Sequence, residues 1–162
     1  MQLSNYTGGL GPMDAEILSE KLDVLLADYQ VYQQNIRKLN WNPSIRPFLQ
    51  LSESIEELQE ATFSHSEVIA DKILMLGSTP STVDGNYLIK ASLTIVEPDI
   101  NYDQALKMIV LNSQELLRTV RGVYELAEGL GEKFTMALMS QLAKSLGGTI
   151  WHFSHLRMAH MN

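Results

Sequence analysis

Two carboxylates in the sequence stand at a spacing that could hold a metal ion. Glu67 and Asp71 are four residues apart in a stretch with helical periodicity, so a helix would stack them on one face. Like charges at this spacing repel each other, and a divalent cation that takes oxygen ligands would relieve the repulsion. A stripe of charges on a helix is, however, usually a solvated face. Spacing alone leaves both interpretations open.

Histidines offer a second set of possible ligands. They are His65, His152, His155 and His160. None has a glutamate three residues before it, so the Glu-x-x-His step of a metal site inside a helical bundle is absent. His152 and His155 share a helix face and could bind a metal. The adjacent Trp151 and Phe153 instead favour imidazoles that pack against neighbouring side chains or point their polar end to solvent. The sequence also lacks the G-x-S-x-G, G-x-x-x-x-G-K and H-E-x-x-H motifs, which leaves hydrolysis, nucleotide binding and zinc proteolysis without support.

Composition narrows the possible partners. A chain of 162 residues with 45% hydrophobic content suits a single domain over residues 1–162. Its net charge of -7 disfavours nucleic acid and anionic membranes, and its lack of cysteine excludes disulfides and thiolate metal sites. No stretch resembles a secretion signal or a membrane span, so a cytoplasmic protein is expected.

Apolar residues at spacings of three and four predict four long amphipathic helices. They cover residues 14–39, 48–76, 101–126 and 134–156, after a flexible arm over residues 1–13. A short proline-bracketed corner joins the first two helices, and a Gly-Leu-Gly turn joins the last two. Residues 78–100 are enough to return along a whole helix, so the second and third helices can run parallel. The sequence therefore predicts an all-α, ferritin-like four-helix bundle with a long crossover.

Local signals indicate where these helices begin and end. Asp14 is the predicted N-cap of the first helix, Gly77 stops the second, and Asn101 with Gln104 predicts a capping box for the third. The crossover segment NYLIKASLTIV could be a short helix or a strand, and we assign a short helix there. Gly147-Gly148 should interrupt the fourth helix, at about 1 kcal/mol per glycine relative to alanine, and indicates a close helix contact or a kink.

Three stretches together resemble one family. LLADYQVYQQNIRKLNWN, FLQLSESIEELQE and EVIADKILMLGSTP are similar to the Dps mini-ferritins, whose members usually read HWN, LHE and D-x-x-AERI at the corresponding places. The similarity extends through YLIKAS, the GEKFT turn and Trp151, and so covers nearly the whole chain. The resemblance implies a hollow homo-oligomer, a dodecamer with two-fold and three-fold interfaces. It also implies that paired ferrous ions are oxidised, preferentially by peroxide, and that ferric mineral is stored.

The resemblance also implies an iron-oxidising site between two subunits, one supplying two histidines and its partner an aspartate and a glutamate. The histidine positions fall on Asn40 and Ser52, and the carboxylate positions fall on Glu67 and Asp71 with their lengths exchanged. Trp41 keeps the tryptophan beside the site. An amide oxygen and a hydroxyl are weaker ligands for ferrous iron than imidazole, so we expect weaker and less selective iron binding. Such a site suits other divalent cations, such as magnesium or calcium.

Two further positions depart from the family pattern. Relatives often line a three-fold pore with two aspartates, where this chain has Glu132 and Ala137, which weakens the acidic funnel for cations. Many relatives bind DNA through a lysine-rich tail, whereas this chain has no lysine or arginine before Lys21. We therefore do not expect DNA binding.

The sequence thus predicts a Dps-like cage that binds and stores iron and protects against oxidative stress. Its ferroxidase activity should be weakened or lost, because both site histidines are absent. The alternative is a non-catalytic structural or interaction shell, in which the carboxylates pair with Lys38, Arg46 or a base of a neighbouring subunit. A co-assembling protein that supplies the activity stays open as well.

Overall fold

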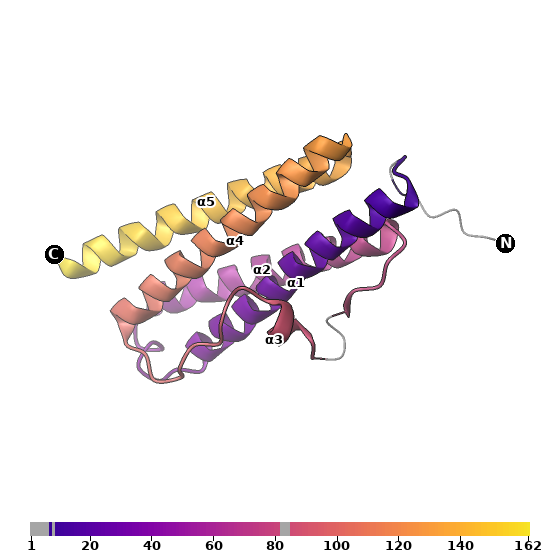
Figure 1. The fold of residues 1–162 in the computed structure, drawn as a ribbon. Helices are drawn as coiled ribbons and strands as arrows, with labels where there is room; N and C mark the ends of the chain where they lie inside the picture. The colour runs from indigo at the N-terminus through magenta and orange to yellow at the C-terminus, as the bar shows by residue number, and fades with distance from the viewer. Residues whose placement is uncertain (1–6, 8, 82–84) are drawn as a thin grey trace.

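The chain forms an elongated bundle of four long helices with one short helix on its side (Figure 1). The computed structural model describes residue 7 and the ranges 9–81 and 85–162. Its helices are α1 (Pro12–Asn40), α2 (Leu49–Met75), α3 (Tyr87–Lys90), α4 (Tyr102–Leu130) and α5 (Lys133–Met161). Two antiparallel hairpins, α1 with α2 and α4 with α5, pack together chiefly through α1 and α4.

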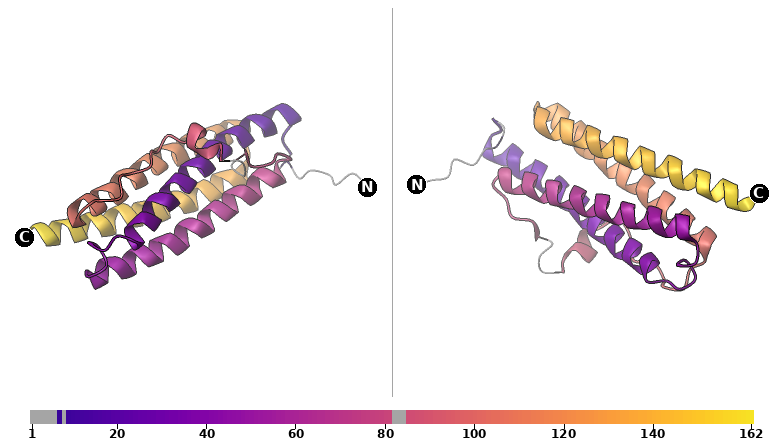
Figure 2. Two further views of the ribbon diagram at one scale, coloured as in Figure 1. Left: turned by 90° about the horizontal axis from the view of Figure 1, so that it is seen from below. Right: turned by 180° about the vertical axis from the view of Figure 1, so that it is seen from behind.

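The crossover between α2 and α4 determines the topology. It returns along the bundle beside α1, so that α4 begins at the same end of the bundle as α2 and runs parallel to it (Figure 2). This arrangement confirms the predicted ferritin-like bundle and its long crossover. The crossover carries α3, a helix of four residues, which confirms the choice of a helix over a strand there.

The helix ends agree with the sequence signals at two places and differ at one. Asn101 and Gln104 form the predicted capping box of α4, and Gly77 follows α2 with a φ of 87°. The prediction that Asp14 caps α1 is wrong, because Gly11 is the N-cap and α1 already begins at Pro12. Proline is favoured in a first turn, where its missing N–H removes no bond, and Asp14 lies in that turn near the positive helix end.

Residues 1–6 and 8 of the predicted N-terminal arm lie outside the described residues. The last two residues of the arm, Pro12 and Met13, belong to α1.

The glycine pair in α5 does not interrupt the helix. α5 runs without a break from Lys133 to Met161, so the predicted interruption at Gly147-Gly148 is wrong. A methyl group added at either glycine would meet no atom within 4 Å among the described residues. A close helix contact inside the chain is therefore not the reason for these glycines.

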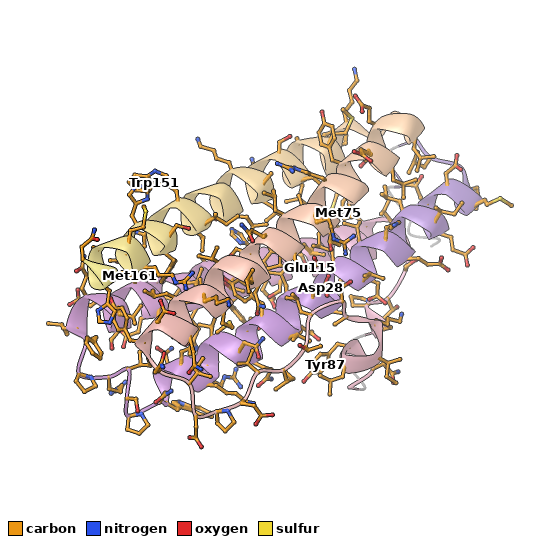
Figure 3. The ribbon with its side chains drawn as sticks, turned by 60° about the vertical axis from the view of Figure 1, so that its left-hand side comes forward. Asp28, Met75, Tyr87, Glu115, Trp151 and Met161 are labelled. Atoms are coloured by element: carbon orange, nitrogen blue, oxygen red, sulfur yellow. The ribbon has the colours of Figure 1, made fainter. Side chains whose placement is uncertain are left out.

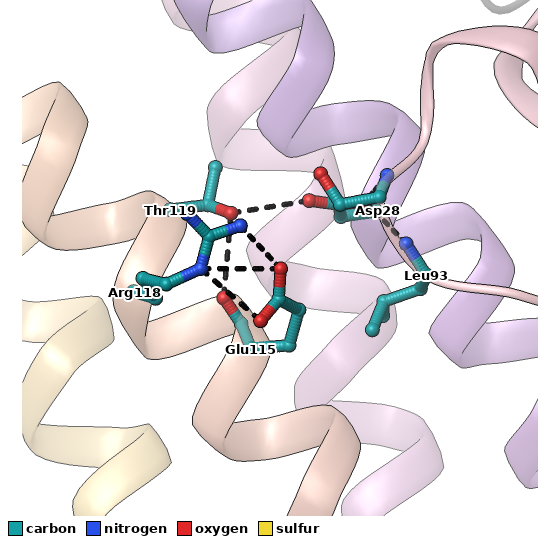
Figure 4. A network of polar contacts seen from close by, with 6 residues as sticks. Asp28, Leu93, Glu115, Arg118 and Thr119 are labelled. Carbon is teal, nitrogen blue, oxygen red and sulfur yellow. Dashed lines mark hydrogen bonds and ion pairs between the residues drawn. The ribbon is translucent and has the colours of Figure 1, made fainter.

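Polar side chains of α1 bind the irregular backbone of the crossover. Asp28 accepts hydrogen bonds from the backbone N–H groups of Ser92 and Leu93 and from the Thr119 hydroxyl (Figure 4). Burial raises the pKa of the Asp28 carboxyl above its usual value, although the three donors act in the opposite direction. In the corner just after α1, Asn42 donates to the carbonyl of Ile100 at 2.8 Å. These bonds satisfy backbone groups that regular secondary structure leaves unpaired in this segment.

Replacing Asn35 by alanine should lower the free energy of unfolding by about 1–3 kcal/mol. The buried Asn35 side chain donates to the Thr94 carbonyl at 3.0 Å and accepts from the Val96 N–H at 2.9 Å. The variant leaves the Thr94 carbonyl and the Val96 N–H without their hydrogen-bond partner on α1. Urea unfolding, with the exposed Gln114→Ala as the matched control, measures the effect, and equal midpoints for the two variants would contradict it.

Candidate metal centre

The predicted ligands lie in two groups at opposite ends of α2. Asn40 is the last residue of α1 and Ser52 lies in the first turn of α2, whereas Glu67 and Asp71 lie toward the other end of α2. The helix rise places Ser52 and Glu67 about 22 Å apart along the axis. One ion cannot bridge that distance, so the predicted ligands of one chain form two separate groups, which we call the two half-sites.

Asn40 and Ser52 are held by neighbours in the corner between α1 and α2. The Asn40 amide nitrogen donates to the side-chain oxygen of Gln59, which leaves the amide oxygen as the atom suited to a metal. The Ser52 hydroxyl donates to the Arg46 carbonyl at 3.3 Å. Trp41 is 76% exposed beside them, with the Arg37 guanidinium 6.0 Å from its ring. These contacts hold the two weaker ligands in place at one end of the helix pair.

The second half-site consists of carboxylates that face solvent. Glu67 and Asp71 are both exposed, one turn apart on α2, and neither forms an ion pair with any described residue. Lys38 donates to the Val96 carbonyl at 2.7 Å and Arg46 lies 3.5 Å from the Asn40 carbonyl, so both bases are used elsewhere. Neutralisation of this pair inside the chain is therefore not observed.

An exposed row of side chains on α2 connects the two half-sites. We call this row the α2 stripe; it consists of Ser52, Glu56, Glu60, Phe63, Glu67 and Asp71. Its central part lines a groove of about 380 Å³ between α2 and α1, to which α1 contributes Gln33 and Arg37. Phe63 is 58% exposed in the middle of this acidic row. A large exposed aromatic among carboxylates is typical of a surface that another molecule covers.

No group of three histidine or carboxylate side chains gathers around a common point in the part of the chain that the structure describes. His152 and His155 take different neighbours, since His152 lies 3.0 Å from the Ser54 hydroxyl and the His155 ring stacks on Trp151. His65 packs edge-on against Tyr29, and burial lowers its pKa. The histidines are therefore separate from the half-sites.

Glu132, the predicted pore residue, lies in the interior of the chain. Its carboxylate accepts from the Thr135 N–H at 2.7 Å, which caps α5, and lies 3.3 Å from the buried Lys72 ammonium. Burial raises the pKa of Glu132, but the bonds from Thr135 and Lys72 outweigh this effect and hold the pKa below its usual value. The pore position concerns an assembly and stays a prediction.

The arrangement of helices and half-sites can be compared with known proteins. No family model matches the chain. A Haemophilus influenzae protein described as uncharacterized is 27% identical over 154 residues, which cover 93% of this chain and 94% of that protein. The "DNA protection during starvation protein" of Porphyromonas gingivalis is 27% identical over 146 residues, covering 90% and 92%.

Solved structures match over the same extent. The crystal structure of a Dps protein from Vibrio cholerae has a TM-score of 0.87 and 28% identity, and the match covers 91% of this chain and 93% of that one. In sequence and in fold, the chain is thus similar to Dps proteins. The Vibrio cholerae Dps protein is described as a member of a broad superfamily of ferritin-like diiron-carboxylate proteins. None of the helices that the structure describes in this chain is long and apolar enough to cross a membrane.

The structure adds one residue to the predicted site, because the Gln59 side-chain oxygen holds the amide of Asn40. The sequence gives no signal for Gln59, since its role depends on where the end of α1 meets α2.

Proposed function

We propose that this Dps-like chain assembles with copies of itself into a cage that binds and stores iron and limits oxidative damage. The observation that carries the proposal is the division of the ligands into two half-sites that only a second copy can complete. The name "DNA protection during starvation protein", carried by three relatives, supports the protective role.

The spacing of the α2 stripe suits an antiparallel pair of α2 helices. Ser52 and Asp71, Glu56 and Glu67, and Glu60 and Phe63 are each symmetric about the midpoint between residues 61 and 62. A two-fold axis at that midpoint would place Ser52 opposite the second copy's Asp71, with each Phe63 near the centre. Each pair of copies would then hold two equivalent sites, one at each end of the paired helices.

Such a site would treat ferrous iron as its substrate. Glu67 and Asp71 would supply the negative charge that binds the ion, and the oxygens of Asn40 and Ser52 would complete a set without imidazole. Oxidation of two ferrous ions by one peroxide consumes two protons and yields two ferric ions and two waters. Oxygen ligands favour the harder ferric product, so this set suits storage better than tight ferrous binding.

Iron loading tests the proposal directly. Purified protein is given ferrous iron and then peroxide, and is run on a native gel that is stained for protein and for iron. We expect iron to migrate with the assembled protein. Iron that precipitates free of the protein band, as it does with an unrelated protein, would contradict the storage function.

The alternative is a structural or interaction shell without iron oxidation, and the replacement of both site histidines favours it. Glu67→Gln combined with Asp71→Asn separates the two functions. Unchanged iron uptake together with altered assembly would support the shell. Lost uptake with intact assembly would support the iron site.

Replacing Phe63 by glutamate should prevent the proposed pairing of copies, because it places a charge at the centre of the interface. We expect light scattering to show a large assembly, a dodecamer on the family pattern, for the unaltered protein and a much smaller species for the variant. Leu111→Glu, on the exposed side of α4, is the matched control. A Phe63→Glu assembly of unchanged size would contradict the two-fold arrangement.

Other properties follow from charge and family. A net charge of -7 favours a cage that does not bind DNA, and we place this cage in the cytoplasm as part of the proposal. Gel retardation of duplex DNA at moderate salt would contradict this expectation. Glu132 would lie near a three-fold pore of such a cage, already neutralised by Lys72.

A further inference from the structure

One exposed face near the end of α5 carries soft metal ligands. Trp151, His155, Met158 and Met161 follow one another at spacings of four, three and three, so they lie along one side of the helix. Trp151 is 64%, Met158 53% and Met161 72% exposed. Figure 3 shows Trp151 on the outer side of α5 and Met161 near the end of this helix.

The other polar side chains of this segment point toward the bundle. His152 lies 3.0 Å from the Ser54 hydroxyl of α2, Arg157 donates to Asp103 of α4 at 2.7 Å, and His160 stacks on Tyr102 with ring centroids 4.1 Å apart. Packing therefore accounts for these three residues. It does not account for the exposed imidazole of His155 or the exposed thioethers of Met158 and Met161.

A backbone contact selects the tautomer of His155. Its Nδ1 lies 2.7 Å from the Trp151 carbonyl oxygen, and a carbonyl can only accept, so Nδ1 carries the proton. In neutral imidazole this leaves Nε2 with a free lone pair, which is the state of a metal-binding histidine. The contact also fixes the ring orientation, since the imidazole stacks on Trp151 with centroids 4.2 Å apart.

We propose that His155 and Met158, with Met161 as a third ligand, form a binding site for a soft monovalent cation of the copper(I) type. Thioether sulfur and neutral imidazole suit copper(I), whereas magnesium, calcium and ferric iron prefer oxygen. His155 and Met158 are neighbours on the helix surface, and Met161 lies one further turn on, where the long thioether side chain can adapt.

Two features of α5 favour a cation at this place. The helix ends at Met161, so its last carbonyl groups provide partial negative charge close to the site. The Trp151 ring lies beside His155 and attracts cations through its π face. The site lies at the C-terminal end of α5 and shares no residue with the iron half-sites. It therefore goes beyond the proposed storage function.

Competition with a chromophoric copper(I) chelator such as bicinchoninate tests the site under anaerobic conditions on the full-length protein. We expect His155→Gln and Met158→Leu each to weaken copper(I) binding by about tenfold or more, as loss of a metal ligand does. Met75→Leu, which removes an exposed methionine from the end of α2, is the matched control and should change binding less than twofold. Magnesium should not compete with copper(I).

Tryptophan fluorescence provides a second readout, which a change in the protein's structure alone would not produce. In a Trp41→Phe background, Trp151 is the remaining tryptophan, and copper(I) should quench it in proportion to occupancy. Circular dichroism confirms that each variant is folded. Equal affinities for the unaltered protein, His155→Gln and Met158→Leu, or an equal loss in Met75→Leu, would overturn the proposal and show only nonspecific thioether binding.

Discussion

Replacing Lys72 by methionine should lower the free energy of unfolding by about 3–5 kcal/mol, the usual effect of removing one partner from a buried ion pair. The Lys72 ammonium and the Glu132 carboxylate lie 3.3 Å apart, and both side chains are almost fully buried. Without the ammonium, Glu132 keeps the Thr135 N–H but loses its counter-charge in an apolar environment. Urea unfolding of the two proteins measures the difference.

Two further variants make the measurement specific. Arg118→Met removes one partner of an exposed pair with Glu115 and should change the free energy of unfolding far less than Lys72→Met, because solvent screens the exposed pair. Lys72→Met combined with Glu132→Gln should be more stable than Lys72→Met alone, because no charge is then left buried and Gln can still cap α5. If the double variant lost as much as the sum of the single variants, the pair would not be coupled.

The Lys72–Glu132 pair should make the free energy of unfolding depend on pH in a direction that can be predicted. The pKa of Glu132 is lowered in the folded protein, so the pair stabilises the fold above the usual carboxyl pKa, and this stability is lost as the pH falls through the lowered value. Lys72→Met should reduce the amount of unfolding free energy that is lost as the pH falls. If the unfolding free energy of Lys72→Met falls as steeply in acid as that of the unaltered protein, other carboxylates cause the loss.

Restoring the two imidazoles should produce the largest gain of activity. In Asn40→His combined with Ser52→His, imidazole nitrogens would take the place of the two oxygen ligands that we propose, and we expect peroxide-driven iron oxidation to rise by about tenfold or more. The Asn40 position suits this change, because Gln59 already orients its side chain at the end of α1. Stopped-flow absorbance of the ferric product measures the rate.

Gln114→His combined with Gln141→His is the matched control, because it adds two imidazoles at exposed positions of α4 and α5 outside the α2 stripe. It should leave the rate unchanged. An equal rise in both double variants would mean that any surface histidine accelerates the reaction. No rise in either would mean that the half-sites of two copies do not meet.

The helices of the bundle were predictable because each long helix repeats apolar residues on one face. The crossover was predictable in length but not in placement, since it has little regular structure of its own. Its path depends on Asp28 and Asn35 of α1 and on Asn42 in the corner after it, and the sequence shows these only as polar residues in or beside an apolar helix. Their role becomes visible when the backbone they bind lies against α1.

The candidate site stays a prediction at the level of its residues: sequence spacing proposed Glu67 and Asp71, and the family resemblance proposed Asn40 and Ser52. The interior position of Glu132 was not predictable, because its partner Lys72 lies on a distant part of the chain. The misplaced start of α1 arose because Asp14 and Gly11 both suit a helix N-terminus, and proline at the first turn decided between them.

The most direct test of the central claim is anaerobic addition of ferrous iron followed by peroxide, with ferric absorbance recorded for the unaltered protein and for Glu67→Gln combined with Asp71→Asn. An iron-binding cage predicts oxidation faster than that of free iron, which the double variant loses while light scattering shows the same assembly. A rate equal to that of free iron in both proteins would contradict the iron function and would support the alternative, a structural or interaction shell without iron oxidation.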